Sequence, residues 1–310
     1  MENKKFNYKT IYTIYIIIFC IIFAYFIGWY IICKKYKNYA IEKIDSIPNL
    51  SYKKVSLNGF PFKFGLKFKD LQMSSTSYGV NVNFSTNKLQ FSKPLFDNIV
   101  KIGIDNIKYE AEDDRIIELI IEDGNALAVE FKDKQILSIN AIVPSITIKD
   151  SLEKNKEMVI KNMIYKAEEI KNDSYINRPN FLDVEKILTY TYNDGKQELQ
   201  NESNFSLDLS LISIIENESV LSSGIDLNKA VYNDITNNYS LNFNGEYKSN
   251  SETIFSLLFN IDMNNYDNFI NSLKDPVKLE TAKNLENIIP NMNNGEKNRH
   301  ITIKKAVDSD

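Results

Sequence analysis

The sequence predicts a mainly β protein: an N-terminal transmembrane helix, then an elongated antiparallel sheet domain with two short helices near the C-terminus. Three observations predict this class. An apolar, uncharged run occupies Ile11–Cys33. Apolar and polar residues alternate through most of 51–260, which is the period of a strand. Helical spacing of apolar residues returns only after residue 265. Strands that follow one another without helices favour an antiparallel sheet over a nucleotide-binding α/β fold.

The first element is the run Ile11–Cys33, which has no charged residue in 23 positions. A helix of this length spans roughly 35 Å, enough to cross the apolar core of a bilayer. Aromatic residues near both ends, such as Tyr12 and Trp29, are typical of membrane interfaces. We expect an uncleaved signal anchor. A cleaved signal peptide is the alternative, but the run exceeds the usual apolar segment and no small-residue cleavage site follows it.

Lysines flank the anchor on both sides, so the positive-inside rule does not orient the chain. The short N-terminal arm favours residues 1–10 in the cytoplasm and the C-terminal domain outside it. We expect residues 34–50 to form a linker that first continues the helix and stops at Pro48. Residues 51–305 then form one β-rich soluble domain, and 306–310 form a tail.

Within the soluble domain, alternating segments such as 78–84, 100–104, 127–131 and 205–211 predict strands. Asp123-Gly124 and Asp194-Gly195 have the composition of tight hairpin turns. Residues 158–170 fit a strand or a helix, and we favour the strand. Residues 214–236 indicate irregular structure or a short helix.

The C-terminal elements follow from spacing and capping residues. Apolar residues spaced over Tyr266–Leu273 predict the first short helix. Asp275-Pro276 is a typical helix start, and Pro290 ends this second predicted helix. Arg299–Lys305 then predicts a final short strand suited to the edge of a sheet.

Composition excludes several functions. A formal net charge of −4 with mixed signs is a poor match for a nucleic-acid binder. The two cysteines, Cys20 and Cys33, lie in the apolar run, so thiol catalysis and thiolate metal sites are excluded elsewhere. The single histidine, His300, is expected in an exposed loop, and one histidine cannot build a metal cluster. We therefore expect no enzyme activity, no metal and no cofactor.

The strongest single signal is the stretch 57–73, in which one strand face is apolar and the other is rich in lysine. The candidate binding residues all lie on the apolar face of this predicted strand: Phe60, Phe62, Phe64, Leu66 and Phe68. Two interpretations remain open. The aromatic face packs into the core, or it lines an open apolar groove that binds lipid chains.

Three residues add detail to this segment. Gly59 permits a backbone conformation that other residues resist. Pro61 donates no backbone hydrogen bond, which suits the start of an edge strand. Asp70 shifts the alternation, because the apolar residues after it have the opposite parity, and this predicts a bulge or a bend.

The motif Gly59-Phe60-Pro61-Phe62-Lys63-Phe64, placed after an anchor and before a long β region, resembles a bacterial family. It is catalogued as domain of unknown function 2125. The resemblance extends over roughly 11–305, although only 55–73 are specific. It implies a single-anchor envelope protein of the bacterial inner membrane with a periplasmic domain. The family has no established catalytic residues, so none is transferred.

These observations together predict a non-enzymatic envelope protein that is held in the membrane by residues 11–33. Its expected role is lipid binding or a part in envelope biogenesis, with a lipid or an envelope protein as partner and no nucleic acid. The alternative is a structural or assembly scaffold that acts through protein contacts alone.

Overall fold

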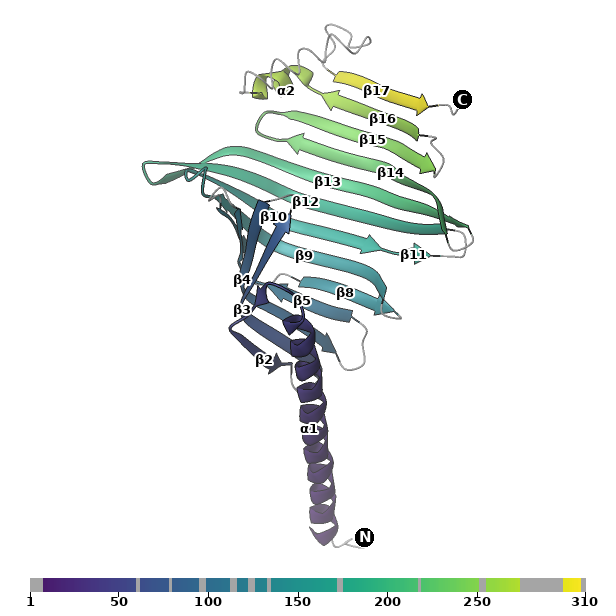
Figure 1. The fold of residues 1–310 in the computed structure, drawn as a ribbon. Coiled ribbons are helices and arrows are strands. Elements are labelled where there is room, and N and C mark those ends of the chain that lie inside the picture. Colours follow the sequence, from purple (N-terminus) through teal and green to yellow (C-terminus); the bar gives the residue numbers. More distant parts are fainter. Residues whose placement is uncertain are drawn as a thin grey trace, which may run out of the picture.

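The computed structural model describes residues 8–59, 62–77, 80–94, 99–111, 116–121, 126–132, 135–171, 175–216, 219–250, 255–273 and 298–307. In these residues the chain forms two helices and one large antiparallel sheet (Figure 1). The predicted fold class is therefore confirmed.

Helix α1 (Tyr8–Asp45) projects from one end of the sheet (Figure 1). Among the described residues it is the one helix long and apolar enough to cross a membrane. Side chains such as Ile17, Phe19 and Ile31 are exposed, as expected for a helix that meets lipid and not protein. The helix continues past Cys33 and ends at Asp45, shortly before Pro48, as predicted. The structure thus supports a single N-terminal anchor.

The sheet contains seventeen strands. Those nearest α1 are β1 (Leu50–Ser51), β2 (Lys54–Asn58), β3 (Lys63–Ser77), β4 (Val80–Pro94), β5 (Ile99–Ile104), β6 (Ile107–Ala111), β7 (Ile116–Ile121), β8 (Ala126–Lys132) and β9 (Gln135–Asp150). The others are β10 (Lys156–Glu168), β11 (Ile170–Lys171), β12 (Tyr175–Asn193), β13 (Lys196–Glu216), β14 (Ser219–Asp234), β15 (Tyr239–Asn250), β16 (Phe255–Asn264) and β17 (Asn298–Val307). Helix α2 (Tyr266–Ser272) lies between β16 and β17 in the chain.

The strands form a meander in which neighbours in sequence are neighbours in the sheet. β5 and β6 both pair with β4, and β7 and β8 both pair with β9. Each of these couples therefore occupies one position in the strand order, and we call each such position a rung. From β2 to β17 the described sheet has thirteen such rungs. At about 4.8 Å per strand, it extends roughly 58 Å away from the anchored end.

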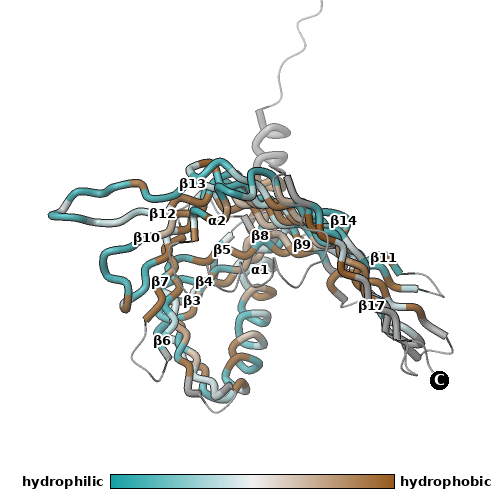
Figure 2. The backbone as a smooth tube through the Cα atoms, turned by 90° about the horizontal axis from the view of Figure 1, so that it is seen from above, coloured by the Kyte–Doolittle hydropathy of each residue, from teal (hydrophilic) through white to brown (hydrophobic). Residues whose placement is uncertain are grey.

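The sheet bends along a line that crosses five strands and the junction of β5 with β6, and the pairing register is the same on both sides of this line. On either side of this line the inward-facing residues step by three positions instead of two. The steps are Phe68 to Leu71, Thr86 to Leu89, Ile104 to Ile107, Val143 to Ile146, Ile160 to Met163 and Val184 to Ile187. Asp70 and Asn162 have φ of 51° and 52° at this line, and the register is unshifted there, so the predicted feature at Asp70 is a bend and not a β-bulge. Seen from above, the sheet forms two walls with α1 between them (Figure 2).

Several local predictions are confirmed. Residues 156–168 form strand β10, and α2 falls at Tyr266–Ser272. Asp194 and Gly195 join β12 to β13 with φ of 49° and 76°, the left-handed pair that a two-residue hairpin turn needs. The final strand, β17, lies at the edge of the sheet. Gly59 has the expected positive φ, 88°.

Three local predictions are wrong. Residues 219–234 form strand β14, not irregular structure or a helix. Strand β3 is not the edge, because β1 and β2 pair with its outer side. His300 lies within strand β17 and not in a loop, although its side chain is exposed. The turn at 123–124 and the second C-terminal helix lie outside the described residues.

Candidate functional site

The predicted aromatic strip divides between core and surface. Leu66 and Phe68 are 5% and 1% exposed, beneath Ala40 and Ile44 of α1. The Phe64 ring lies 5.4 Å from the Tyr36 ring of α1. Helix α1 therefore packs on the apolar face of β3, which identifies this face as the inside of the bend (Figure 2).

Phe62 behaves differently from the rest of the strip, since its side chain is 71% exposed before the first residue of β3. Phe60 lies outside the described residues. A binding role for these five residues stays a prediction, and α1 already occupies the face that Leu66 and Phe68 present.

The apolar face of β3 continues without interruption across the whole sheet. Residues that pair directly in neighbouring antiparallel strands lie on the same face. Starting at β2, one such row contains an apolar residue on every rung, and we call it the inward row. Its members are Leu57, Leu66, Phe91, Ile102, Leu127, Ala141, Tyr165, Leu182, Leu207, Ala230, Phe243, Ile261 and Ile301.

The opposite face has a different composition. The neighbouring row, one residue along each strand, is mostly polar. It contains Asn58, Gly65, Ser92, Lys101, Ala128, Asn140, Lys166, Phe181, Asp208 and Lys229. The sheet is therefore amphipathic over its full length, with an apolar inner face and a polar outer face.

The described residues cover this inner face at its two ends only. Near the membrane, α1 packs on β2 and β3. At the far end, Phe269 of α2 meets Tyr239 with 5.4 Å between ring centroids, and Tyr266 is buried beside it. Each described strand has its close backbone contacts with its hydrogen-bonded neighbours, and the two walls diverge from the bend when the sheet is seen from above (Figure 2).

Burial varies along the inward row. Ala141, Ala230 and Ile301 are buried, at 8%, 7% and 4% exposed. Leu207, Phe243 and Ile261 are only partly buried, although they lie in the middle of long strands. Leu211 and Ile225, on the same face, are 38% and 40% exposed. The accessible surface of the structure is 21605 Å², whereas a compact monomer of 35.9 kDa exposes about 13,000 Å².

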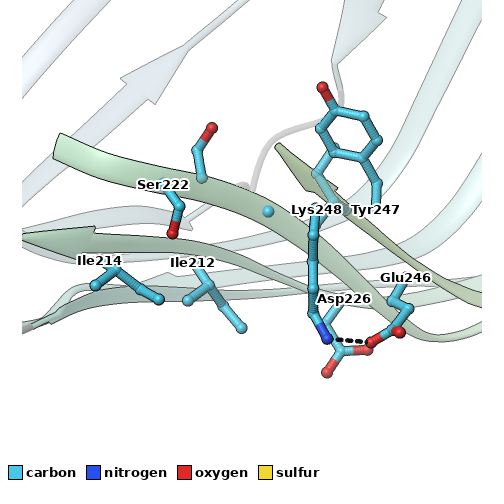
Figure 3. Close-up of a pocket in the computed structure, with 10 residues that line it drawn as sticks. Ile212, Ile214, Ser222, Asp226, Glu246, Tyr247 and Lys248 are labelled. Atoms are coloured by element: carbon cyan, nitrogen blue, oxygen red, sulfur yellow. Dashed lines mark hydrogen bonds and ion pairs between the residues drawn. The ribbon is translucent and has the colours of Figure 1, made fainter. Parts of the chain in front are cut away.

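A small pocket of about 210 Å³ lies on the outer face of β13–β15 (Figure 3). Ile212 and Ile214 form its apolar side, and Lys248 and Glu246 form an ion pair at 2.7 Å at its rim. The pocket exists because Gly224 places no side chain there: a Cβ at this position would lie 2.8 Å from the carbonyl oxygen of Tyr247.

The titratable side chains of the described residues do not form a recognisable catalytic or metal-binding group. His300 Nδ1 contacts Asp262, and its Nε2 lies 3.0 Å from the Thr302 hydroxyl, but all three side chains sit on the open outer face. Within the described part of the chain, no three His, Cys, Asp or Glu side chains gather as a metal site would require. Burial near α2 raises the pKa of the Tyr239 hydroxyl to about 12, which suits packing and not proton transfer at neutral pH.

Comparison of the chain with models of protein families, with curated proteins and with solved structures finds no match. The resemblance of the Gly59–Phe64 motif to a bacterial envelope family therefore stays a prediction. Function has to be argued from the geometry of the sheet itself.

Sequence reasoning found one rung of the inner face and missed the rest. Alternation was visible at Phe205–Leu211, but it could not show that Leu207 lies in the same row as Leu66. That information lies in the register between strands far apart in the sequence. The repeated three-residue step at Thr86–Leu89 or Ile160–Met163 was a readable signal, because it is the same parity shift that Asp70 produces in β3.

Proposed function

We propose that this is a non-enzymatic, membrane-anchored protein of the bacterial envelope, and that the inner face of its sheet binds the acyl chains of lipids. One observation supports this above all: the inward row has an apolar residue on each of the thirteen described rungs. A monomer in water rarely exposes a contiguous apolar patch of this extent unless a ligand or partner covers it.

The dimensions and position favour acyl chains as the ligand. One leaflet of a bilayer is about 15 Å of hydrocarbon, so a row of roughly 58 Å has room for several chains in succession. The row begins at β2, beside the helix that enters the membrane (Figure 1). Because α1 covers the row at its first strands, lipids that leave the bilayer would meet uncovered apolar side chains only beyond β4, from Ile102 onward.

The composition of the row points the same way. A site for a polar ligand places a few hydrogen-bonding groups among its apolar residues. The inward row offers a single polar atom, the Tyr165 hydroxyl, which donates to Asn180 Oδ1 at 2.9 Å. Along this row, contact with a ligand is almost entirely apolar, as methylene chains require. Polar side chains of the inner face, such as Asn180 and Asp234, lie beside the row.

Native mass spectrometry of the full-length protein, released from mild detergent, tests the proposal. The inner-face variant Phe243→Asn/Ile261→Asn should lose at least half of the lipid that copurifies with the wild type. The matched control is Val231→Asn/Leu258→Asn, which adds the same polar groups to the outer face of neighbouring strands. Equal lipid content in both variants would contradict the proposal. So would recovery of a stoichiometric envelope protein that covers the face in place of lipid.

The proposed location has its own test. Protease added to spheroplasts should degrade residues 34–310 and leave the anchor, because we place the sheet in the periplasm. A sheet that is protected until the membrane is permeabilised would lie in the cytoplasm instead.

A further inference from the structure

Charge is distributed very unevenly along this chain. Residues 34–101 contain twelve lysines and four carboxylates, a net charge of +8. Residues 102–310 contain 22 basic and 36 acidic residues, a net charge of −14. The positive segment is the one that forms the end of the sheet beside the anchor (Figure 1).

Three of these lysines lie directly opposite one another on adjacent strands. Lys54 of β2 pairs in register with Lys69 of β3, and Lys69 pairs with Lys88 of β4. We call these three residues the lysine ladder. Their Cβ atoms are about 5 Å apart, and like charges in such positions destabilise a sheet. A sequence that keeps this arrangement despite its cost is expected to use the charge elsewhere.

The ladder borders a wide, open hollow of about 580 Å³ on the outer face. Lys53, Lys67 and Asn87 also line it, together with the carboxylates of Asp70 and Asp105. Of the ion pairs among described residues, only Lys53–Asp70, at 3.6 Å, lies in this group, and both side chains are largely exposed. The hollow therefore keeps a strong positive excess.

The position of the ladder selects its partner. Tyr36 lies three residues beyond Cys33, about 4.5 Å along the helix axis, and its ring contacts Phe64. The start of β3 is thus within one helical turn of the predicted membrane exit. Lys69 of the ladder lies further out, next to Phe68, which packs beneath Ala40 and Ile44 at about 10–17 Å along the helix from Cys33. That height is close to the outer limit of the headgroup region, within about one Debye length of it. Phe62, 71% exposed, lies beside the start of β3 next to Lys63, and exposed aromatic and lysine side chains together are typical of residues at a membrane surface.

We propose that the lysine ladder binds the anionic headgroups of the membrane that holds α1. The positive end of the sheet is attracted to that surface, and the negative remainder is repelled from it, so the sheet stands away from the bilayer. This interaction uses the outer face and does not depend on acyl-chain binding by the inner face. Each lysine near an anionic surface is worth about a fivefold gain in affinity.

Native mass spectrometry of the full-length protein in detergent, titrated with phosphatidylglycerol or with phosphatidylcholine of identical chains, tests the inference. The wild type should bind phosphatidylglycerol at least tenfold more tightly. The variant Lys54→Gln/Lys69→Gln/Lys88→Gln should lose roughly 100-fold in affinity for phosphatidylglycerol at low salt and keep its affinity for phosphatidylcholine. A loss below threefold would overturn the inference.

Matched variants distinguish the effect of the lysine ladder from the effect of the net charge of the protein. Lys161→Gln/Lys166→Gln/Lys196→Gln removes the same charge from exposed positions further from the anchor and should leave the preference intact. Arginine at the three ladder positions should restore binding. The glutamine ladder variant should be at least as heat-stable as the wild type, because it removes three opposed charges. If the three lysines instead stabilised the fold, the glutamine variant would unfold at a lower temperature than the wild type.

Two soluble anions serve as competitors in the same titration. Inorganic phosphate at millimolar concentration should not displace phosphatidylglycerol, because the acyl chains of the lipid hold its headgroup in the micelle around α1, close to the ladder. Displacement by phosphate, or tight binding of duplex DNA without a preference among lipids, would overturn the membrane assignment.

Discussion

The base of the sheet, β2 and β3, and its upper strands, such as β15, have the same apolar face, but helix α1 covers this face only at the base. At the base, Phe68 lies beneath α1 and is 1% exposed. Higher up, Phe243 faces the same side, is partly exposed, and has Ala230 and Ile261 as neighbours in its row. An alternating pattern therefore produces a core where a helix lies on it and an open surface where none does. What decides between the two is the length of α1, not the strand sequence.

This difference has an energetic consequence. Full burial of a phenylalanine side chain stabilises a fold by about 1.5–3 kcal/mol, and partial burial realises only part of that. The base is thus the part of the domain that the chain stabilises by itself. The upper strands would gain most from a bound apolar ligand, because a ligand that binds only the folded state stabilises it.

Two alanine substitutions, one at the base and one in the upper strands, test this difference most sharply. Phe68→Ala should lower the free energy of unfolding by about 3–5 kcal/mol, because it leaves a cavity beneath α1. Phe243→Ala should cost about 1 kcal/mol in lipid-free protein, because water already reaches that side chain. Urea unfolding of the full-length protein in detergent measures both. Equal losses would mean that the upper face is covered like the base.

The bend between the walls can be weakened at Asp70, whose φ of 51° is unfavourable for residues with a Cβ. Asp70→Ala should destabilise the protein by about 1–2 kcal/mol, since alanine lacks the local polar contacts that make this region accessible. Asp70→Gly should be close to neutral. Its ion pair with Lys53 is exposed and contributes little. A glycine variant as unstable as the alanine variant would contradict a backbone origin for the effect.

A smaller, pH-dependent effect on stability is expected at Tyr239, where α2 covers the sheet. The pKa of Tyr239 is raised to about 12 in the folded protein and lies near 10 in the unfolded chain. Its contribution is therefore complete below pH 10 and is lost as the pH rises from 10 towards 12. Thermal unfolding across this range should show a steeper decline for the wild type than for Tyr239→Phe. Parallel declines would show that the hydroxyl is not sheltered by α2.

The smallest expected effect is at Phe62. Its side chain is 71% exposed, so Phe62→Lys should change the free energy of unfolding by less than about 0.5 kcal/mol. The same substitution at Phe64, beside Tyr36, should be clearly destabilising. A large loss at Phe62 would move it from the surface into the packed base.

The local sequence pattern was enough to predict the mainly β class, the apolar N-terminal helix and the bend at Asp70, because each depends on residues close in sequence. It failed at 219–234, where Gly224 and its serine neighbours interrupt the apolar alternation although the strand is fully paired. It also missed the edge, because β2 has only five residues and β1 only two. The candidate site was found on one strand only, since register across thirteen rungs depends on contacts that no local period reports.

The central claim is that the inner face of the upper strands holds lipid while the outer face does not. Photo-crosslinking along β15 tests it most directly, with a benzophenone side chain placed in turn at residues 240–243 of the membrane-embedded, full-length protein. The inward positions Leu241 and Phe243 should give lipid adducts, and the outward positions Ser240 and Asn242 should not, so that the yield alternates with period two. Adducts that are absent at all four positions, or equal at all four, would contradict the account.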